Sequence, residues 1–212
     1  MTYEFELPLI CLLFVSILGL VFFYKKRVML VENSMYKVIV ISSWLEILIN
    51  TIIHFICSFN SYDVLLKKYY VLFDYLNKIL ATLFVIIFVS LFCYILIITY
   101  SEVRENSKKL IKVSIIIEFI FFICTFFTHV NLIDMGSVIN VNGSTIVMGY
   151  ICVFILLVLS LLVTLLNLKK IDKRHIVIFG IIVVLGIVFA LTLLFPGMII
   201  YDLAPALLCY IM

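Results

Sequence analysis

The sequence predicts an all-α integral membrane protein: a bundle of seven transmembrane helices with the N-terminus outside the cell and the C-terminus inside. Hydrophobic residues make up 67% of the 212 residues and charged residues 13%, whereas a soluble domain is nearer half apolar and a quarter charged. The apolar residues gather in long runs, most of them close to the ~20 residues that cross a bilayer core of about 30 Å. Basic residues are concentrated in alternate connections between these runs.

Seven apolar segments account for most of the chain, which is expected to form a single membrane domain. Backbone polar groups in lipid must be satisfied within the segment, which favours helices, and the runs lack the alternation of barrel strands. The first segment follows an acidic, lysine-free N-terminus, unlike a secretory signal, and is expected to remain as an anchor. The segments are residues 7–23, 36–57, 70–99, 110–130, 150–168, 176–194 and 198–212.

The basic residues predict the orientation, because connections rich in Lys and Arg stay in the cytoplasm. The opposite side holds only Lys67, Lys68 and Lys78. These short basic loops lack the interleaved aromatic residues of a nucleic-acid platform, so the expected partner is the lipid bilayer and not a nucleic acid. The connections after the first, third and fifth segments hold Lys25, Lys26, Arg27, Lys37, Arg104, Lys108, Lys109, Lys112, Lys169, Lys170, Lys173 and Arg174.

The connection between the fourth and fifth segments predicts a small extracellular β-hairpin. Residues 136–149 read GSVINVNGSTIVMG. Asn142-Gly143 is a strong two-residue turn signal, because both residues tolerate positive φ. Residues 138–141 and 144–147 on either side are rich in β-branched side chains. An irregular loop is the alternative, since an isolated hairpin is only marginally stable in water.

No enzyme motif appears in the sequence. It contains no Gly-rich phosphate loop, no G-x-S-x-G elbow and no H-E-x-x-H helix, and its three histidines do not cluster. The six cysteines are spread through the segments without a C-x-x-C pair, as expected of small side chains that pack between helices. We therefore expect that this chain is not an enzyme and that it holds no catalytic site, cofactor or metal.

The second segment carries polar residues inside its apolar run. Glu46, Asn50 and His54 follow one another at four-residue intervals. Each interval turns a helix by about 40°, so the three side chains lie within about 80° of one face. A charged carboxylate facing lipid costs at least about 2.5 kcal/mol, so Glu46 should face the bundle interior, be protonated, or both. Glu118 and Asn77, from the fourth and third segments, are its expected partners.

This polar face has two interpretations that the sequence leaves open. It is either a site for a ligand, an ion or a proton, or a set of interhelical hydrogen bonds, typically worth about 0.6 kcal/mol and at most about 2 kcal/mol each. A zinc site from His54 and Glu46 is disfavoured, because no second histidine lies within reach in the sequence. Asp74 and Lys78, one helical turn apart near the outer end of the third segment, are expected to form an ion pair.

The last segment is short. Pro196-Gly197 is expected to break or kink the helix that precedes it. As a helix, residues 198–212 would span roughly 22 Å, less than the ~30 Å of the hydrocarbon core. We therefore expect that the chain is truncated before a cytoplasmic output domain.

Two stretches resemble a family. The run YKKRVMLVENSMYKVIVISSWLEILIN, residues 24–50, resembles the first inner loop and second helix of the seven-helix membrane regions of bacterial (Firmicutes-type) sensor histidine kinases. The stretch RHIVIFGIIVVLGIVFALTLLFPGMIIYDLAPALLCYIM, residues 174–212, is similar to their last two helices. The chain departs from these kinases in that no histidine has a phosphoacceptor context and no ATP-binding box is present. The most telling residues are Lys26-Arg27, Glu32, Tyr36 and Arg174-His175.

The resemblance implies a membrane-embedded sensor region of a two-component histidine kinase. Such a region lies in the bacterial cytoplasmic membrane, works within a homodimer, and responds to an unknown small ligand or to the membrane itself. Its seventh helix would pass the signal to a kinase beyond Met212. The alternatives are a polytopic transporter or permease fragment, and the same input module fused to another output such as a cyclic-dinucleotide enzyme. A G-protein-coupled receptor shares only the expected topology.

Overall fold

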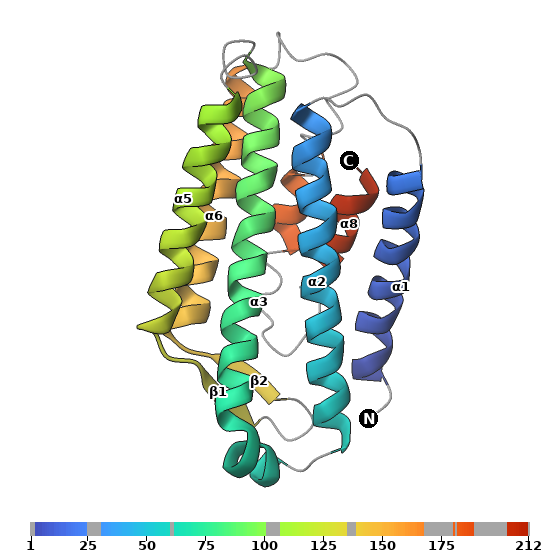
Figure 1. The fold of residues 1–212 in the computed structure, drawn as a ribbon, viewed down its shortest axis with the longest axis vertical. Helices are drawn as coiled ribbons and strands as arrows, with labels where there is room; N and C mark the ends of the chain where they lie inside the picture. The colour runs from blue at the N-terminus through green and yellow to red at the C-terminus, as the bar shows by residue number, and fades with distance from the viewer. Residues whose placement is uncertain are drawn as a thin grey trace.

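The computed structural model describes residues 3–24, 31–59, 62–100, 107–134, 139–167, 180, 182–188 and 203–211. They form a bundle of long helices that lie side by side, with a short β-hairpin at one end (Figure 1). Residues 182–188 are also helical. The elements are α1 (Tyr3–Tyr24), α2 (Val31–Phe59), α3 (Tyr62–Thr99), α5 (Ser107–Phe126), β1 (Asn131–Asp134), β2 (Ile139–Asn142), α6 (Ser144–Leu166) and α8 (Leu203–Ile211).

Four of these helices contain stretches long and apolar enough to cross a membrane. The stretches are Glu6–Tyr24 in α1, Ser34–Ile56 in α2, Tyr69–Thr99 in α3 and Ser144–Leu166 in α6. α5 is 20 residues long and carries three lysines in its first turns and Glu118 further along. The chain is therefore a helical membrane protein.

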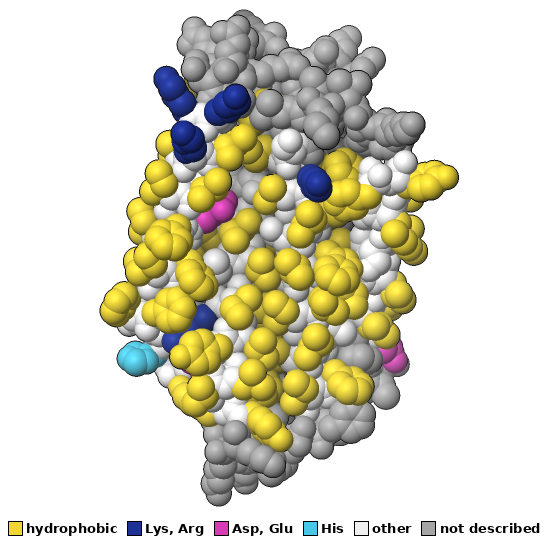
Figure 2. All heavy atoms as spheres, in the orientation of Figure 1, with side chains coloured by type: hydrophobic (Ala, Val, Ile, Leu, Met, Phe, Trp, Pro, Cys, Tyr) yellow, Lys and Arg dark blue, Asp and Glu magenta, His cyan; other side chains and the backbone are white. Residues whose placement is uncertain are grey.

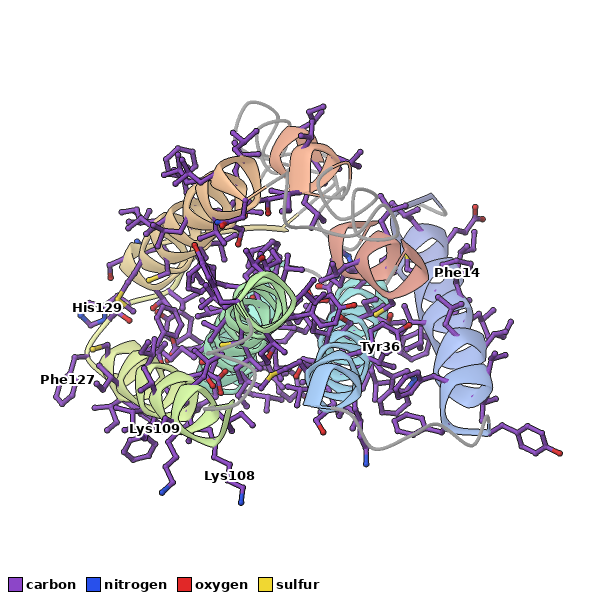
Figure 3. All side chains as sticks on the ribbon, turned by 90° about the horizontal axis from the view of Figure 1, so that it is seen from above. Phe14, Tyr36, Lys108, Lys109, Phe127 and His129 are labelled. Atoms are coloured by element: carbon purple, nitrogen blue, oxygen red, sulfur yellow. The ribbon has the colours of Figure 1, made fainter. Side chains whose placement is uncertain are left out.

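α3 lies at the centre of the bundle. It packs against α2, α5 and α6, while α8 packs against α1 and α2 (Figures 1 and 3). The second half of α3 is buried on most sides, as Val85, Ile87, Leu91 and Ile97 show. A helix that is apolar all round is expected at such a position, since it has no solvent-facing side.

The outer faces of the helices are covered with exposed apolar side chains (Figure 2). In α1, Ile10, Leu13, Ile17 and Leu20 are each more than half exposed. Soluble monomers rarely expose apolar surface on this scale. These faces are explained by contact with lipid chains, because an apolar side chain that faces hydrocarbon carries no cost of exposure to water.

Several helices extend beyond the apolar segments from which they were predicted. α2 begins at Val31, α3 at Tyr62 and α6 at Ser144, where the predicted segments begin at 36, 70 and 150. In α2 and α3 the first turns precede the apolar stretch, which begins at Ser34 and Tyr69, whereas in α6 the apolar stretch itself begins at Ser144. Pro196-Gly197 and most of the basic connections lie outside the described residues.

A hairpin joins α5 to α6, but its turn is not the predicted one. β1 pairs antiparallel with β2, with Asn131 opposite Asn142 and Asp134 opposite Ile139. Residues 144–147, predicted as the second strand, form the first turn of α6. They run directly into a long apolar segment, so the helix propagates back through them despite their β-branched side chains.

Gly143 is the junction between strand β2 and helix α6. Its φ of 130° lies in a region that only glycine adopts readily. A Cβ at this position would lie 2.3 Å from the carbonyl oxygen of His129. The backbone therefore turns sharply here and packs against the chain that leaves α5. The Ser144 hydroxyl accepts a 3.0 Å hydrogen bond from the His129 N–H, and this bond holds the start of α6 against the segment that follows α5.

Gly143→Ala is expected to destabilise the bundle, because it combines an unfavourable φ with a backbone clash. The cost should be about 1–3 kcal/mol, seen as a fall of several degrees in the unfolding midpoint of the purified protein in detergent. Gly186→Ala is the matched control, since a Cβ there meets no atom within 4 Å. Equal midpoints for the two variants would contradict this account of the junction.

Candidate functional site

The predicted polar face of α2 lies inside the bundle. Glu46 and Asn50 are each 3% exposed, and His54 is partly buried. Ser43, one turn before Glu46, is completely buried. The four-residue spacing of the sequence thus places these side chains along the packed side of α2, while Leu45 and Ile52 face outward.

The Ser43–Glu46 part of this face meets the last helix, α8. The Cys209 thiol lies beside the Ser43 hydroxyl and close enough to the Glu46 carboxyl to interact with it electrostatically. The Tyr36 hydroxyl donates a buried hydrogen bond of 2.7 Å to the Cys209 carbonyl oxygen. We call these four residues the α2–α8 cluster. Figure 3 shows Tyr36 inside the bundle, on the side of α2 that faces α8.

Glu118 belongs to a different interface. It is partly buried on α5 and lies near the Cys93 thiol of α3, which also interacts with the Ser114 hydroxyl. Ser114 in turn donates a 2.9 Å hydrogen bond to the Ile111 carbonyl of its own helix. Glu46 thus meets α8 and Glu118 meets α3. The expectation that Glu118 is a partner of Glu46 receives no support from these contacts.

Asn77 is buried but turned toward its own helix. Its side-chain amide donates a 2.8 Å hydrogen bond to the Phe73 carbonyl, one turn earlier in α3. The predicted pair of Asp74 and Lys78 is present in the same part of α3, with Lys78 Nζ 2.8 Å from Asp74 Oδ2. Lys78 also lies over the Tyr75 ring, 6.0 Å from its centroid. The two opposite charges therefore neutralise each other within α3.

Two hydrogen bonds between helices were not predicted from the sequence. The Trp44 indole N–H donates to the Ser16 hydroxyl at 2.9 Å and ties α2 to α1. The Asn167 amide donates to the Tyr100 hydroxyl at 2.8 Å, between the ends of α6 and α3. Single polar or amphipathic residues within apolar runs or at their ends are the signal for these bonds in the sequence, and they do not identify the partner.

The chemistry available at the α2–α8 cluster is hydrogen bonding and protonation at a helix interface. It brings a carboxyl group, two hydroxyls and a thiol together next to the carbonyl oxygen of Cys209. Among the described residues, no group of three or more His, Cys, Asp or Glu side chains is placed to hold a metal ion. A change in the charge or hydrogen bonding of this cluster would therefore act on the packing of α8.

Tyr36→Phe removes a hydrogen bond that attaches α8 to α2, so α8 should separate from α2 more often and expose Cys209. The bond is worth about 0.5–2 kcal/mol, which predicts a rise of roughly 2- to 30-fold in the rate at which maleimide labels Cys209. The measurement uses protein with the other cysteines replaced. Tyr24→Phe is the control, because Tyr24 is 93% exposed, and its labelling rate should match the parent. Equal rates for the two variants would show that the Tyr36 bond does not hold α8.

No protein-family model matches the sequence, and no curated protein matches it either. The basis for a function is therefore the geometry of the α2–α8 cluster together with the resemblance carried by residues 24–50 and 174–212.

Proposed function

We propose that this chain is the membrane-embedded sensor region of a two-component histidine kinase in the bacterial cytoplasmic membrane. In this proposal the helices form a seven-span bundle with the N-terminus outside, working within a homodimer. A small ligand or a change in the membrane alters the bundle, and the last helix passes that change to a cytoplasmic kinase. The observation that carries the proposal is the packing of α8 against the buried polar face of α2.

The position of α8 supports a role in transmission. It is a short helix packed against both α1 and α2, and its residues Ala206, Leu208 and Cys209 are buried. The hydrogen bond from Tyr36 joins its backbone to α2. A helix held by a small interface can be displaced by an energy of a few kcal/mol, the scale on which ligands shift two-state equilibria.

The distribution of charge supports the proposed orientation. α2 and α5 start at the same end of the bundle (Figure 1), and their first turns carry the exposed Lys37, Lys108, Lys109 and Lys112. The remaining lysine whose side chain is described, Lys78, is paired with Asp74. Unpaired positive charge among the described side chains therefore lies at one end, which the positive-inside rule places in the cytoplasm.

The buried carboxyl of Glu46 supplies a means of sensing. A signal shifts a conformational equilibrium only when it interacts differently with the two states. Glu46 lies between α2 and α8, so its protonation, or a ligand that bonds to it, would act differently on packed and displaced α8. The contact between its neighbours Ser43 and Cys209 would also be lost when α8 is displaced.

Cysteine labelling should reveal the proposed orientation. On a cysteine-free background, Asn131→Cys at the hairpin should react with a membrane-impermeant maleimide in intact cells. Lys108→Cys at the start of α5 should react only after the cells are permeabilised. Both positions are exposed, so the difference in labelling reports the side of the membrane alone. The opposite pattern would reverse the topology.

Substitution of Glu46 in the full-length protein should change signalling. Glu46→Gln keeps the shape and hydrogen-bonding capacity and removes the titrating group, whereas Glu46→Leu removes the polar group altogether. We expect Gln to alter the dependence of autophosphorylation on external pH or ligand while expression and folding stay intact. Autophosphorylation is measured in membranes carrying each variant and the wild type.

The outcomes separate the two parts of the proposal. Unchanged response curves in both variants would leave Glu46 a structural residue, since loss of structural hydrogen bonds should cost only a kcal/mol or two. A full-length protein without autophosphorylation would instead contradict the kinase assignment itself and favour a transporter or another signalling output.

A further inference from the structure

The start of α5 carries a compact group of amines on the outside of the bundle. Lys108, Lys109 and Lys112 are all exposed, and Figure 3 shows Lys108 and Lys109 reaching outward from α5. Among the described residues, none of the three forms an ion pair. At 100° per residue, the three side chains fall within about 100° of the helix circumference. The group therefore presents up to three positive charges on one side of a single helix.

An exposed apolar strip continues from this group along the same face of α5. Ile116, Phe119, Ile120 and Ile123 are 57%, 61%, 54% and 41% exposed. By helix geometry, they share an arc of about 120° with the lysines. From Lys112 to Ile123 the helix rises roughly 16 Å, close to the thickness of one leaflet of a ~30 Å hydrocarbon core.

This face is turned away from the protein. α5 packs chiefly against α3, and it does so with the opposite side, which carries Ser114, Glu118 and the buried Phe121. Figure 2 shows basic side chains gathered at one end of the molecule above apolar side chains on α5. The lysines and the strip together match a molecule with a negatively charged head and one leaflet's length of hydrocarbon.

We propose that this face of α5 is a binding site for an anionic phospholipid, with the headgroup phosphate on Lys108, Lys109 and Lys112 and the acyl chains along the strip. Charge complementarity selects the occupant: each lysine near an anionic membrane surface contributes attraction, and a zwitterionic headgroup gains far less. Lys37 differs: it is the one lysine in the sequence of α2, and it lies over the Phe23 ring, 5.6 Å from its centroid. The site is independent of the proposed signalling function.

The test measures the selectivity of the reconstituted protein for spin-labelled phosphatidylglycerol over spin-labelled phosphatidylcholine in phosphatidylcholine bilayers. The wild type should prefer phosphatidylglycerol. In the triple variant Lys108→Gln, Lys109→Gln, Lys112→Gln the ratio of affinities for phosphatidylglycerol and phosphatidylcholine should fall about tenfold. The corresponding triple Arg variant should retain it, because the charge is preserved. Lys37→Gln should retain most of it, because it removes one charge outside the site.

Three results would overturn the proposal. The triple Gln variant could keep the preference, or Lys37→Gln could reduce it as much as the triple change does. Millimolar glycerol 3-phosphate could also displace the labelled lipid, which would make the lysines a site for free phosphate compounds and not for a lipid. Matching unfolding midpoints of the Gln and Arg variants in detergent establish that the comparison is made between folded proteins.

Discussion

A polar side chain within a membrane has to be satisfied by the protein, because hydrocarbon supplies no hydrogen-bond partner. Many of the buried hydroxyls in this bundle turn back to a carbonyl one turn earlier in their own helix, as Thr51, Thr99 and Thr164 do at 2.7, 2.7 and 2.8 Å. Such bonds satisfy the group without fixing any neighbouring helix. The arrangement of the helices therefore depends on apolar packing around α3 and on bonds that cross between helices, such as those donated by Tyr36 and Trp44.

The α2–α8 cluster is where these two features meet. The Tyr36 hydroxyl donates a hydrogen bond to the backbone of α8, while Ser43 and Glu46 place buried polar atoms beside Cys209. A buried polar group is costly when its partner is lost, so displacement of α8 would expose these groups to a different environment. This coupling links the polar face, whose spacing is visible in the sequence, to the position of the last helix.

Periodicity and hydropathy were sufficient to predict a membrane helical bundle and to place Glu46 on a buried face, because both depend on local spacing. They could not identify the partners. Asn77 bonds to its own helix, and α8 packs on α2 through contacts between residues far apart in the chain. The prediction of a hairpin turn at Asn142-Gly143 was wrong for a similar reason. The β-branched side chains of residues 144–147 favour a strand locally, but the apolar run after Gly143 extends α6 back to Ser144.

The packing of α8 on the polar face of α2 can be measured by disulfide cross-linking. Ser43→Cys is combined with the native Cys209 in a chain that lacks the other cysteines, and membranes are treated with a mild oxidant. The account predicts a rapid disulfide between positions 43 and 209, identified by mass spectrometry of the linked peptides. Ile41→Cys, on the outward side of α2, should not form one with Cys209. Cross-linking from position 41 and not from 43 would contradict the account.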